Sequence, residues 1–345
     1  MKSLSILMTG AAGGVGQTLA RDLIKLGHRL LLTDQNKSEL KRIYATELRD
    51  HSQVSAEKLD ITSHSAWQKL IASWAGRQGS LDIVLNIAGL LRPGYSFNVS
   101  TREIDAHLDV NAKGTIYGIA SASAFMKEQG HGHIISIASL AGVAPIPGIS
   151  LYSASKFAVR GYSLAVAQEL KNYNVQVTVL CPDAIRTPML DLQKDYEEAA
   201  LTFSGSRYLS PTDVSRTLQK IINAGQKGKA PVEVTLPGSR GFLARIASFA
   251  PATNMRIAGL LRRKGLKQQS DYKVETNSLI YESGFRPTNC NLRWLARKLK
   301  PGCDAQAANE YNTLSGPTLA GGQAGQNLLH QHGRECTMGP SIHAP

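Results

Sequence analysis

Seven short apolar runs, separated by amphipathic stretches, fill the first 235 residues of the chain. The stretches between them repeat apolar residues at helical spacing, as in residues 15–27 and 158–172. Strands that are apolar on both faces and joined by helices are typical of a parallel sheet covered on both sides. The alternation predicts a doubly wound α/β fold with strands at residues 4–9, 28–33, 54–59, 81–88, 133–139, 175–181 and 232–236.

The chain after residue 238 has a different character. Residues 236–345 hold 14 of the 39 basic residues but only 6 of the 26 acidic ones. Residues 241–267 form an amphipathic pattern that Pro251 should break into two short helices. Past about Asp271 no periodicity persists, which predicts disorder. We therefore predict a main domain (1–238), a basic amphipathic helical extension (239–270) and a disordered tail (271–345).

Composition narrows the class of protein. A hydrophobic fraction of 42% suffices for a core, and no run approaches the roughly 18 apolar residues of a membrane span. The first residues run directly into a glycine-rich turn, without the longer apolar region of a signal peptide. The four cysteines form no CxxC pair, which favours a reducing compartment and argues against a metal site. We expect a cytoplasmic protein.

The glycine-rich stretch "TGAAGGVG" follows the first expected strand and precedes a helix. Glycines allow a tight turn close to a pyrophosphate, and the helix N-terminus offers N–H groups to the anion. Asp34 ends the second expected strand, where a carboxylate accepts hydrogen bonds from the ribose hydroxyls of NAD and repels a 2′-phosphate. Residues 11–15 contain no Lys or Arg, and Lys37 lies three residues beyond Asp34. NAD is the expected cofactor, and NADP is less favoured.

Tyr152 and Lys156 lie four residues apart in "YSASK" and so share one face of a helix. The pair alone is compatible with an ordinary helix surface. A free tyrosine titrates near 10, and a neighbouring ammonium lowers that pKa by favouring the phenolate. The pair therefore becomes an acid–base device only if a cofactor and a substrate lie beside it.

With these motifs the chain resembles the short-chain dehydrogenase/reductase family over about residues 4–240. The matching features are the glycine loop, Asp60 in "LDIT", "NIAG" (86–89), Ser139 thirteen residues before Tyr152, and Asn111. The resemblance implies a Rossmann-type fold and the catalytic residues Asn111, Ser139, Tyr152 and Lys156. The implied cofactor-binding residues are Thr9, Gly10, Gly14, Val15, Gly16, Asp34, Asp60, Ile61, Asn86, Ala88, Gly89, Tyr152, Lys156, Pro182, Ile185 and Thr187.

The sequence departs from the family at one position. Where the family has Pro-Gly after the sixth strand, this chain has Pro182 followed by Asp183, which places the details of the nicotinamide pocket in question. Residues 188–208 mix apolar and charged side chains, as a mobile lid often does, and residues 142–148 would form another wall. Their apolar content favours a hydrophobic or lipid-like secondary alcohol or ketone as the small-molecule substrate.

Two other functions stay open. One is a non-catalytic dinucleotide-binding sensor or scaffold; the other is an epimerase or dehydratase of the extended branch of the superfamily. Residues 240–267 pair basic and apolar side chains, which suits a packing extension or a peripheral membrane contact. Nucleic-acid binding is disfavoured because no recognition motif accompanies the charge. The resemblance further implies a homodimer or homotetramer.

Overall fold

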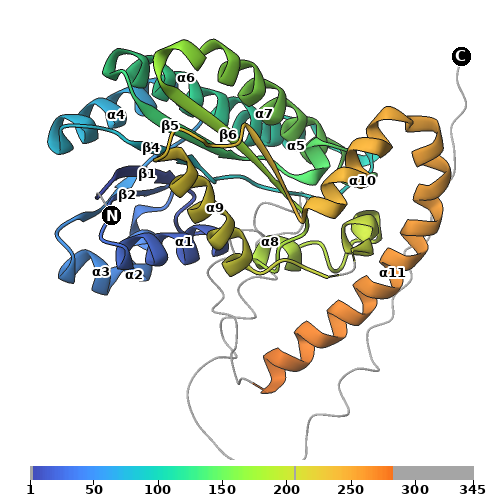
Figure 1. Cartoon of the computed structure of the whole chain (residues 1–345). Helices are drawn as coiled ribbons and strands as arrows, with labels where there is room; N and C mark the ends of the chain where they lie inside the picture. Colours follow the sequence, from blue (N-terminus) through green and yellow to red (C-terminus); the bar gives the residue numbers. More distant parts are fainter. Residues whose placement is uncertain (1–2, 206, 283–345) are drawn as a thin grey trace, which may run out of the picture. The chain divides into compact units, whose positions relative to one another are not determined.

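The computed structural model of the chain describes residues 3–205 and 207–282, which contain a single seven-stranded parallel sheet (Figure 1). The strand order is β3-β2-β1-β4-β5-β6-β7, so the predicted doubly wound, Rossmann-type sheet is confirmed. The strands are β1 (Ser5–Thr9), β2 (Arg29–Asp34), β3 (Val54–Lys58), β4 (Ile83–Asn86), β5 (Gly132–Ile137), β6 (Val175–Pro182) and β7 (Glu233–Leu236).

Helices cover both faces of the sheet (Figure 1). Apolar residues of α1, α2 and α9 form one core with the strands, and those of α4, α6 and α7 form a second core on the opposite face. The helices are α1 (Gly14–Lys25), α2 (Lys37–Ile43), α3 (Ala45–Asp50), α4 (His64–Gln78), α5 (Thr101–Ala106), α6 (Gly114–Gln129), α7 (Ser150–Glu169), α8 (Pro188–Asp191), α9 (Pro211–Gly225), α10 (Gly238–Phe249) and α11 (Pro251–Glu282).

Helix α9 begins with a capping box. The Ser210 hydroxyl accepts a hydrogen bond from the backbone N–H of Asp213, the Asp213 carboxylate accepts from the backbone N–H of Ser210, and Pro211 is the first helical residue. Such reciprocal bonds satisfy N–H groups that the helix leaves unpaired. The local sequence is therefore enough to set this boundary.

The strand order reverses between β1 and β4, the two strands at the centre of the sheet. In doubly wound folds the crevice for a ligand lies at the carboxyl ends of the strands beside this reversal. Thr9, Asn86 and Pro182 are the last residues of β1, β4 and β6. The sheet thereby carries the expected site residues to one edge.

The second helix after β7 is longer than the sequence predicted. Pro251 does separate α10 from a second helix, but α11 runs to Glu282 instead of stopping near Asp271. Its continuation is stabilised by contacts with residues 186–208, including those of the buried Tyr272. Long-range packing of this kind leaves no periodic signal in the sequence. The rest of the predicted tail, from residue 283, lies outside the described residues.

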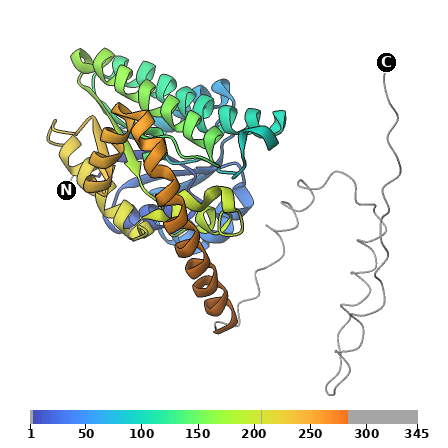
Figure 2. The same ribbon diagram turned by 90° about the vertical axis from the view of Figure 1, so that its right-hand side faces the viewer.

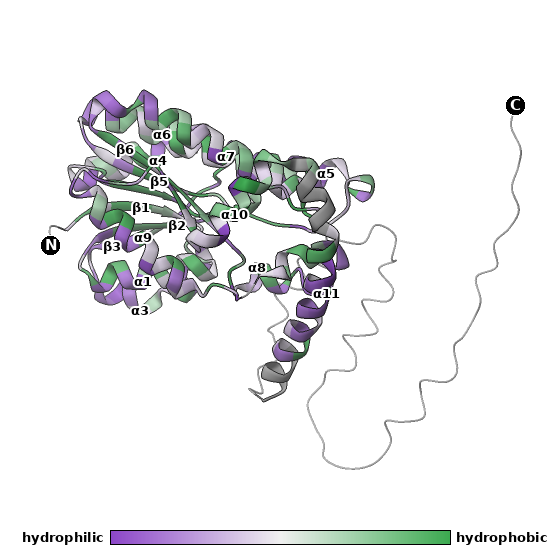
Figure 3. Cartoon of the chain, turned by 45° about the vertical axis from the view of Figure 1, so that its right-hand side comes forward, coloured by the Kyte–Doolittle hydropathy of each residue, from purple (hydrophilic) through white to green (hydrophobic). Residues whose placement is uncertain are grey.

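Hydropathy distinguishes the sheet from the C-terminal helix. Figure 3 shows apolar strands inside the fold and a largely hydrophilic α11, which in the rotated view of Figure 2 extends away from the sheet at its far end. Among the described residues, no helix combines the length and the apolar content that a bilayer crossing needs.

Candidate active site

The glycine loop joins β1 to α1 with very little free space. Gly10 has a φ of +65°, and a Cβ there would lie 2.8 Å from the backbone of Ala88. A Cβ on Gly16 would lie 2.2 Å from the carbonyl oxygen of Gly10. No side chain caps the N-terminus of α1, so its backbone donors face the loop. This arrangement fits a pyrophosphate.

Two neighbouring strand ends support this loop. The Thr9 hydroxyl accepts hydrogen bonds from the backbone N–H groups of Ile87 (3.1 Å) and Ala88 (3.2 Å), which ties the end of β1 to the segment after β4. A Cβ on Gly14 would lie 3.1 Å from Cγ2 of Thr187. The residues predicted from three separate motifs therefore meet around one loop.

Asp34 reaches the same loop from the end of β2. Its carboxylate accepts hydrogen bonds from the backbone N–H groups of Ala12 and Asn36, both at 3.3 Å. Burial raises the pKa of Asp34, while these backbone bonds lower it. Lys37, the nearest cation in sequence, is paired at 2.7 Å with Glu57. The Asp34 carboxylate therefore lies beside the glycine loop.

Other predicted cofactor residues have structural roles that the sequence did not reveal. Asp60 is exposed and binds the N–H and hydroxyl of Thr62. Ile61 packs beneath Gly114, and its carbonyl accepts a hydrogen bond from the Trp67 indole. These contacts leave a role at the adenine as a prediction.

Tyr152 lies in the first turn of α7, among apolar side chains. It packs against a buried apolar cluster of Leu91, Ala141 and Ile149. Burial raises the pKa of Tyr152 to about 12, and a hydrogen bond with Ser139 opposes that rise. The lowering of this pKa by Lys156, which was expected once a cofactor lies beside the pair, stays a prediction.

Lys156 is 3% exposed, one turn beyond Tyr152. Its Nζ donates to the carbonyl of Ile137 at 2.9 Å and lies 5.5 Å from the centre of the Tyr152 ring. Burial lowers the pKa of Lys156 to about 8. The ammonium is thus close to the phenol, but it contacts the ring face rather than the hydroxyl.

Asn111 lies in a π-helical turn (His107–Lys113), a geometry that often marks functional sites. Its carboxamide binds both backbone groups of Leu90, accepting from the N–H at 2.7 Å and donating to the carbonyl at 2.8 Å. It also donates to Ser155, whose hydroxyl donates to the Tyr152 carbonyl. Ser155, within "YSASK", is a link that the sequence reasoning missed.

Asn111 and Lys156 converge on one glycine. A Cβ on Gly89 would lie 3.2 Å from the Asn111 carboxamide oxygen and 3.5 Å from the Lys156 Nζ. The predicted residues Asn111, Ser139, Tyr152 and Lys156 are therefore gathered at the carboxyl ends of β4 and β5. Among the described residues no group of three His, Cys, Asp or Glu side chains could hold a metal ion.

Asp183, the departure from the family pattern, is explained by its partner. Its carboxylate pairs at 2.8 Å with Arg240 of α10, while its backbone N–H donates to Leu236. Burial raises the pKa of Asp183, and Arg240 opposes that rise. The side chain thus anchors the C-terminal extension. The following residues remain next to the glycine loop, with the Thr187 hydroxyl donating to the Ile185 carbonyl at 3.3 Å.

Residues 188–208, which we call the substrate loop, contain α8 and a 3-10 helix (Glu197–Ser204). They lie against α11 (Figure 1). Leu190, Ala199 and Phe203 are buried together with Tyr272 of α11. The composition of this segment is that of a mobile lid, and the structure places its helices against α11.

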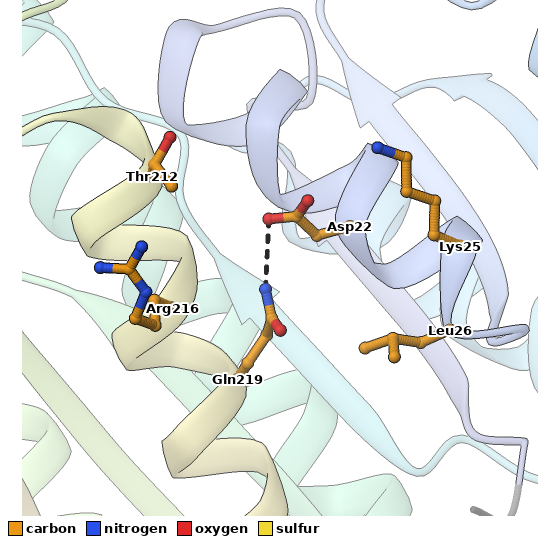
Figure 4. Close-up of a pocket in the computed structure, with 6 residues that line it drawn as sticks. All are labelled: Asp22, Lys25, Leu26, Thr212, Arg216 and Gln219. Carbon is orange, nitrogen blue, oxygen red and sulfur yellow. Dashed lines mark hydrogen bonds between the residues drawn. The ribbon is translucent and has the colours of Figure 1, made fainter.

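A pocket of about 290 Å³ lies elsewhere, between α1 and α9 (Figure 4). Its polar centre is Asp22, which accepts hydrogen bonds from Ser215 and Gln219. None of the predicted site residues lines it. The pocket is lined by Asp22, Lys25, Leu26, Thr212, Arg216 and Gln219.

The sequence profile described as short chain dehydrogenase matches residues 5–198. The chain belongs to the short-chain dehydrogenase family. It is 28% identical over 248 residues to an uncharacterized oxidoreductase of Staphylococcus saprophyticus, covering 70% of this chain and 98% of the relative. A relative from Shigella flexneri, named NADP-dependent 3-hydroxy acid dehydrogenase, is 30% identical over 219 residues, covering 62% of this chain and 86% of the relative.

Solved structures show the same fold. A short chain dehydrogenase/reductase from Burkholderia phymatum in complex with NAD has a TM-score of 0.64 at 22% identity, covering 73% of this chain and 95% of that chain. The structure named ElxO with NADP bound has a TM-score of 0.61 at 22% identity, covering 68% and 97%. The protein is thus a short-chain dehydrogenase-family oxidoreductase with a nucleotide-binding fold, and the predicted family is confirmed.

Proposed function

We propose that the protein is an NAD-dependent oxidoreductase that interconverts a secondary alcohol and its ketone. The observation that carries this proposal is the convergence of Tyr152, Ser139, Lys156 and Asn111 beside the glycine loop. A dinucleotide-binding sensor or scaffold has no need of this acid–base set. An extended-branch epimerase or dehydratase is disfavoured because the loop reads TGAAGGVG, without that branch's glycine spacing.

Tyr152 is the proposed general acid and base. In the oxidation direction its phenolate accepts the proton of the alcohol hydroxyl, and in the reduction direction its phenol returns a proton to the carbonyl oxygen. A nicotinamide cofactor, when bound at the glycine loop, would supply hydride-transfer chemistry at the carbon that carries this oxygen. The Ser139 hydroxyl donates to the substrate oxygen and stabilises negative charge that develops there.

Lys156 has two proposed tasks. One of its three donors binds Ile137, and the others would hold the hydroxyls of the nicotinamide ribose. Its positive charge lies near the ring of Tyr152 and would favour the phenolate once the cofactor site is filled. Asn111, which shares the space at Gly89 with Lys156, would position a water that relays protons to solvent.

The proposed preference for NAD rests on Asp34. A 2′-phosphate there would meet a carboxylate, and Lys37 is already neutralised by Glu57. The relative named NADP-dependent makes NADP the competing cofactor. Both cofactors therefore belong in the first assay.

The surroundings of Tyr152 favour an apolar substrate. Tyr152 packs against a buried apolar cluster of Leu91, Ala141 and Ile149, and a hydrophobic ketone would bury apolar area against the same side chains. A screen of hydrophobic alcohols and ketones with NAD(H) and NADP(H), followed by absorbance of the reduced nicotinamide, tests cofactor and substrate class together.

The decisive variant is Tyr152→Phe. It should retain NADH binding by fluorescence and lose turnover by at least about a thousandfold, because the proton donor is removed while the fold is kept. Full activity in this variant would rule out the proposed mechanism. If neither the wild type nor the variant turns over any compound in the screen while both bind NADH, the sensor or scaffold function is favoured instead.

A second proposal concerns the outer face of α10. Phe242, Leu243, Ile246 and Phe249 are between 49% and 90% exposed on this helix. Arg240 and Arg245 instead point inward and pair with Asp183 and Glu233, so the outer face is apolar. Exposed basic residues follow on α11 (Arg263, Lys264 and Lys267). We propose that this surface makes a peripheral contact with an anionic membrane.

Vesicle flotation tests the membrane contact. The wild type should float with phosphatidylserine-containing vesicles, and the double variant Phe242→Ser/Phe249→Ser should not. Phe97→Ser is the matched control, because Phe97 is 79% exposed at a different site. Equal flotation of the wild type and the double variant would reject the proposal.

A cytoplasmic location and a homodimer or homotetramer are further proposals. They rest on the sparse cysteines and on the resemblance to the family. Cell fractionation and sedimentation velocity test them.

A further inference from the structure

Helix α11 lies beyond the part of the chain that the family profile matches, yet it holds the backbone of the substrate loop. A Cβ on Gly265 would lie 2.0 Å from the Ala200 carbonyl oxygen, so helix and loop are in direct contact. The side chain of Gln269, 5% exposed, donates to the carbonyls of Gln193 (2.9 Å) and Tyr196 (2.8 Å). Both bonds fix the backbone just after α8.

Tyr272, one turn further along α11, holds α8 itself. It is 2% exposed, and its hydroxyl donates to the Asp191 carboxylate at 2.6 Å. Its ring contacts those of Phe203 and Tyr208, with centroids 5.5 and 5.2 Å away. A hydrogen bond to a carboxylate is among the stronger polar contacts in proteins.

Helix α8 connects these anchors to the reacting groups. It is a single turn that ends at Asp191 and follows directly on Thr187. Thr187 lies against Gly14 of the glycine loop, and Met189 packs against the same buried apolar cluster as Tyr152. A shift of Asp191 would therefore move both the cofactor-side and the substrate-side contacts of this turn.

We infer that Gln269 and Tyr272 are positioning residues for the proposed reaction, because they fix α8 against Tyr152 and so set the affinity for substrate. This inference rests on the proposed function. It assigns the C-terminal helix to the wall of the proposed substrate site.

The test compares Tyr272→Phe, which removes only the hydroxyl, with the control Val274→Ala on the exposed side of the same helix. Val274 is 68% exposed. Hydrogen exchange of residues 188–204, followed by mass spectrometry, should be about tenfold faster in Tyr272→Phe, while exchange in β6 stays unchanged. The control should match the wild type in both segments.

Steady-state kinetics distinguish a positioning role from a purely structural one, because only a positioning role should change KM while kcat is kept. With ethyl acetoacetate and NADH as the probe pair, KM for the ketone should rise about tenfold in Tyr272→Phe, with kcat within about threefold of the wild type. Asp191→Ala, which removes the same bond from the other side, should reproduce this split, and it replaces Tyr272→Phe should that variant fail to fold.

Three results would overturn the inference. They are unchanged exchange in residues 188–204, faster exchange spread equally over the loop and β6, or faster loop exchange with an unchanged KM. A wild type that turns over no ketone contradicts the proposed function, whereas the exchange data still decide whether α11 holds the loop. The two failures are thus distinguishable.

Discussion

The cofactor side and the substrate side of the candidate site are built in different ways. On the cofactor side, backbone meets backbone: Gly10 lies against Ala88, and Gly16 lies against Gly10. On the substrate side, polar side chains make the contacts, as in the bond from Tyr272 to Asp191. The cofactor side therefore tolerates no added atom, whereas the substrate side can be altered one contact at a time.

Of the substitutions considered, Gly16→Ala should change affinity most. It adds a Cβ atom where the glycine loop has no room for one, and so should weaken the binding of NADH. The new Cβ would lie 2.2 Å from the Gly10 carbonyl oxygen, and relief of such overlap costs about 3 kcal/mol. If the overlap destabilises the loop conformation that binds NADH, the Kd for NADH should rise by about 100-fold. Fluorescence titration measures this Kd.

Gly76→Ala in α4 is the matched control for this variant. A Cβ there meets nothing within 4 Å, so binding should not change and the helix should gain up to about 1 kcal/mol. NADH binding by Gly16→Ala at wild-type strength would show that the loop is not the phosphate site.

Lys156→Met should stabilise the fold while removing function. Burial lowers the pKa of Lys156 from its ordinary 10.5 to about 8, so the folded protein holds this proton less tightly than the unfolded chain. The stability of the wild type is therefore reduced below pH 8 and rises between pH 8 and 10.5, where the unfolded chain binds more protons.

At pH 7 the apolar Met should thus raise the free energy of unfolding by about 2 kcal/mol, after the loss of the bond to Ile137. Urea denaturation at pH 7 and pH 10.5 measures the free energy of unfolding of both proteins. The advantage of Lys156→Met over the wild type should be smaller at pH 10.5 than at pH 7. The exposed Lys220 provides the control: Lys220→Met should change stability by less than about 0.5 kcal/mol. A destabilised Lys156→Met at pH 7 contradicts the prediction.

Asp34→Ser should shift the cofactor preference by about tenfold towards NADP. Repulsion between a carboxylate and a phosphate a few ångströms apart costs between about 1 and 4 kcal/mol at the surface of a protein. The ratio of Kd values for NADPH and NADH measures the shift. Asp50→Ser, at the exposed end of α3, should leave the ratio unchanged. An unchanged ratio in Asp34→Ser would mean that a group other than Asp34 distinguishes NADH from NADPH.

The same contrast explains what could be predicted from the sequence. The glycine loop, Asp34 and the Tyr152–Lys156 pair lie within single strand–turn or helix segments, so their local spacing already specifies their geometry. The parallel, doubly wound sheet could be predicted because most of its strands are near-continuous apolar runs joined by helices, whereas the order of the strands was not predicted. Four catalytic candidates from separate motifs met because parallel strands end at one edge.

The substrate side could not be predicted in this way. Gln269 and Tyr272 look like ordinary polar helix residues, and nothing local shows that they face residues 191–196. Asp183 looked like a change in the nicotinamide pocket until its partner Arg240 was located. The raised pKa of Tyr152 is likewise a result of burial, which spacing along a helix does not reveal.

Arg186→Gln should have the smallest effect on the KM for ketone. It tests whether the exposed ion pair from Arg186 to Glu275 holds the substrate loop as strongly as the bond from Tyr272 to Asp191 does. Arg186 forms two bonds with Glu275, at 2.7 and 3.2 Å, but both side chains are about half exposed. Its guanidinium also lies 5.6 Å from the ring centre of Tyr272. Exposed ion pairs contribute at most about 1 kcal/mol, and an exposed cation–π contact about 0.5.

The KM for ketone in Arg186→Gln should therefore rise by about threefold, which corresponds to about 0.7 kcal/mol and is below the tenfold change expected for Tyr272→Phe. Arg42→Gln is the control, because Arg42 pairs with Glu39 in the same two-bond manner on α2, away from the substrate loop. It should leave KM unchanged. Were Arg186→Gln to match Tyr272→Phe, the exposed charge pair would be the main anchor of the loop, and the buried bond from Tyr272 to Asp191 would be secondary.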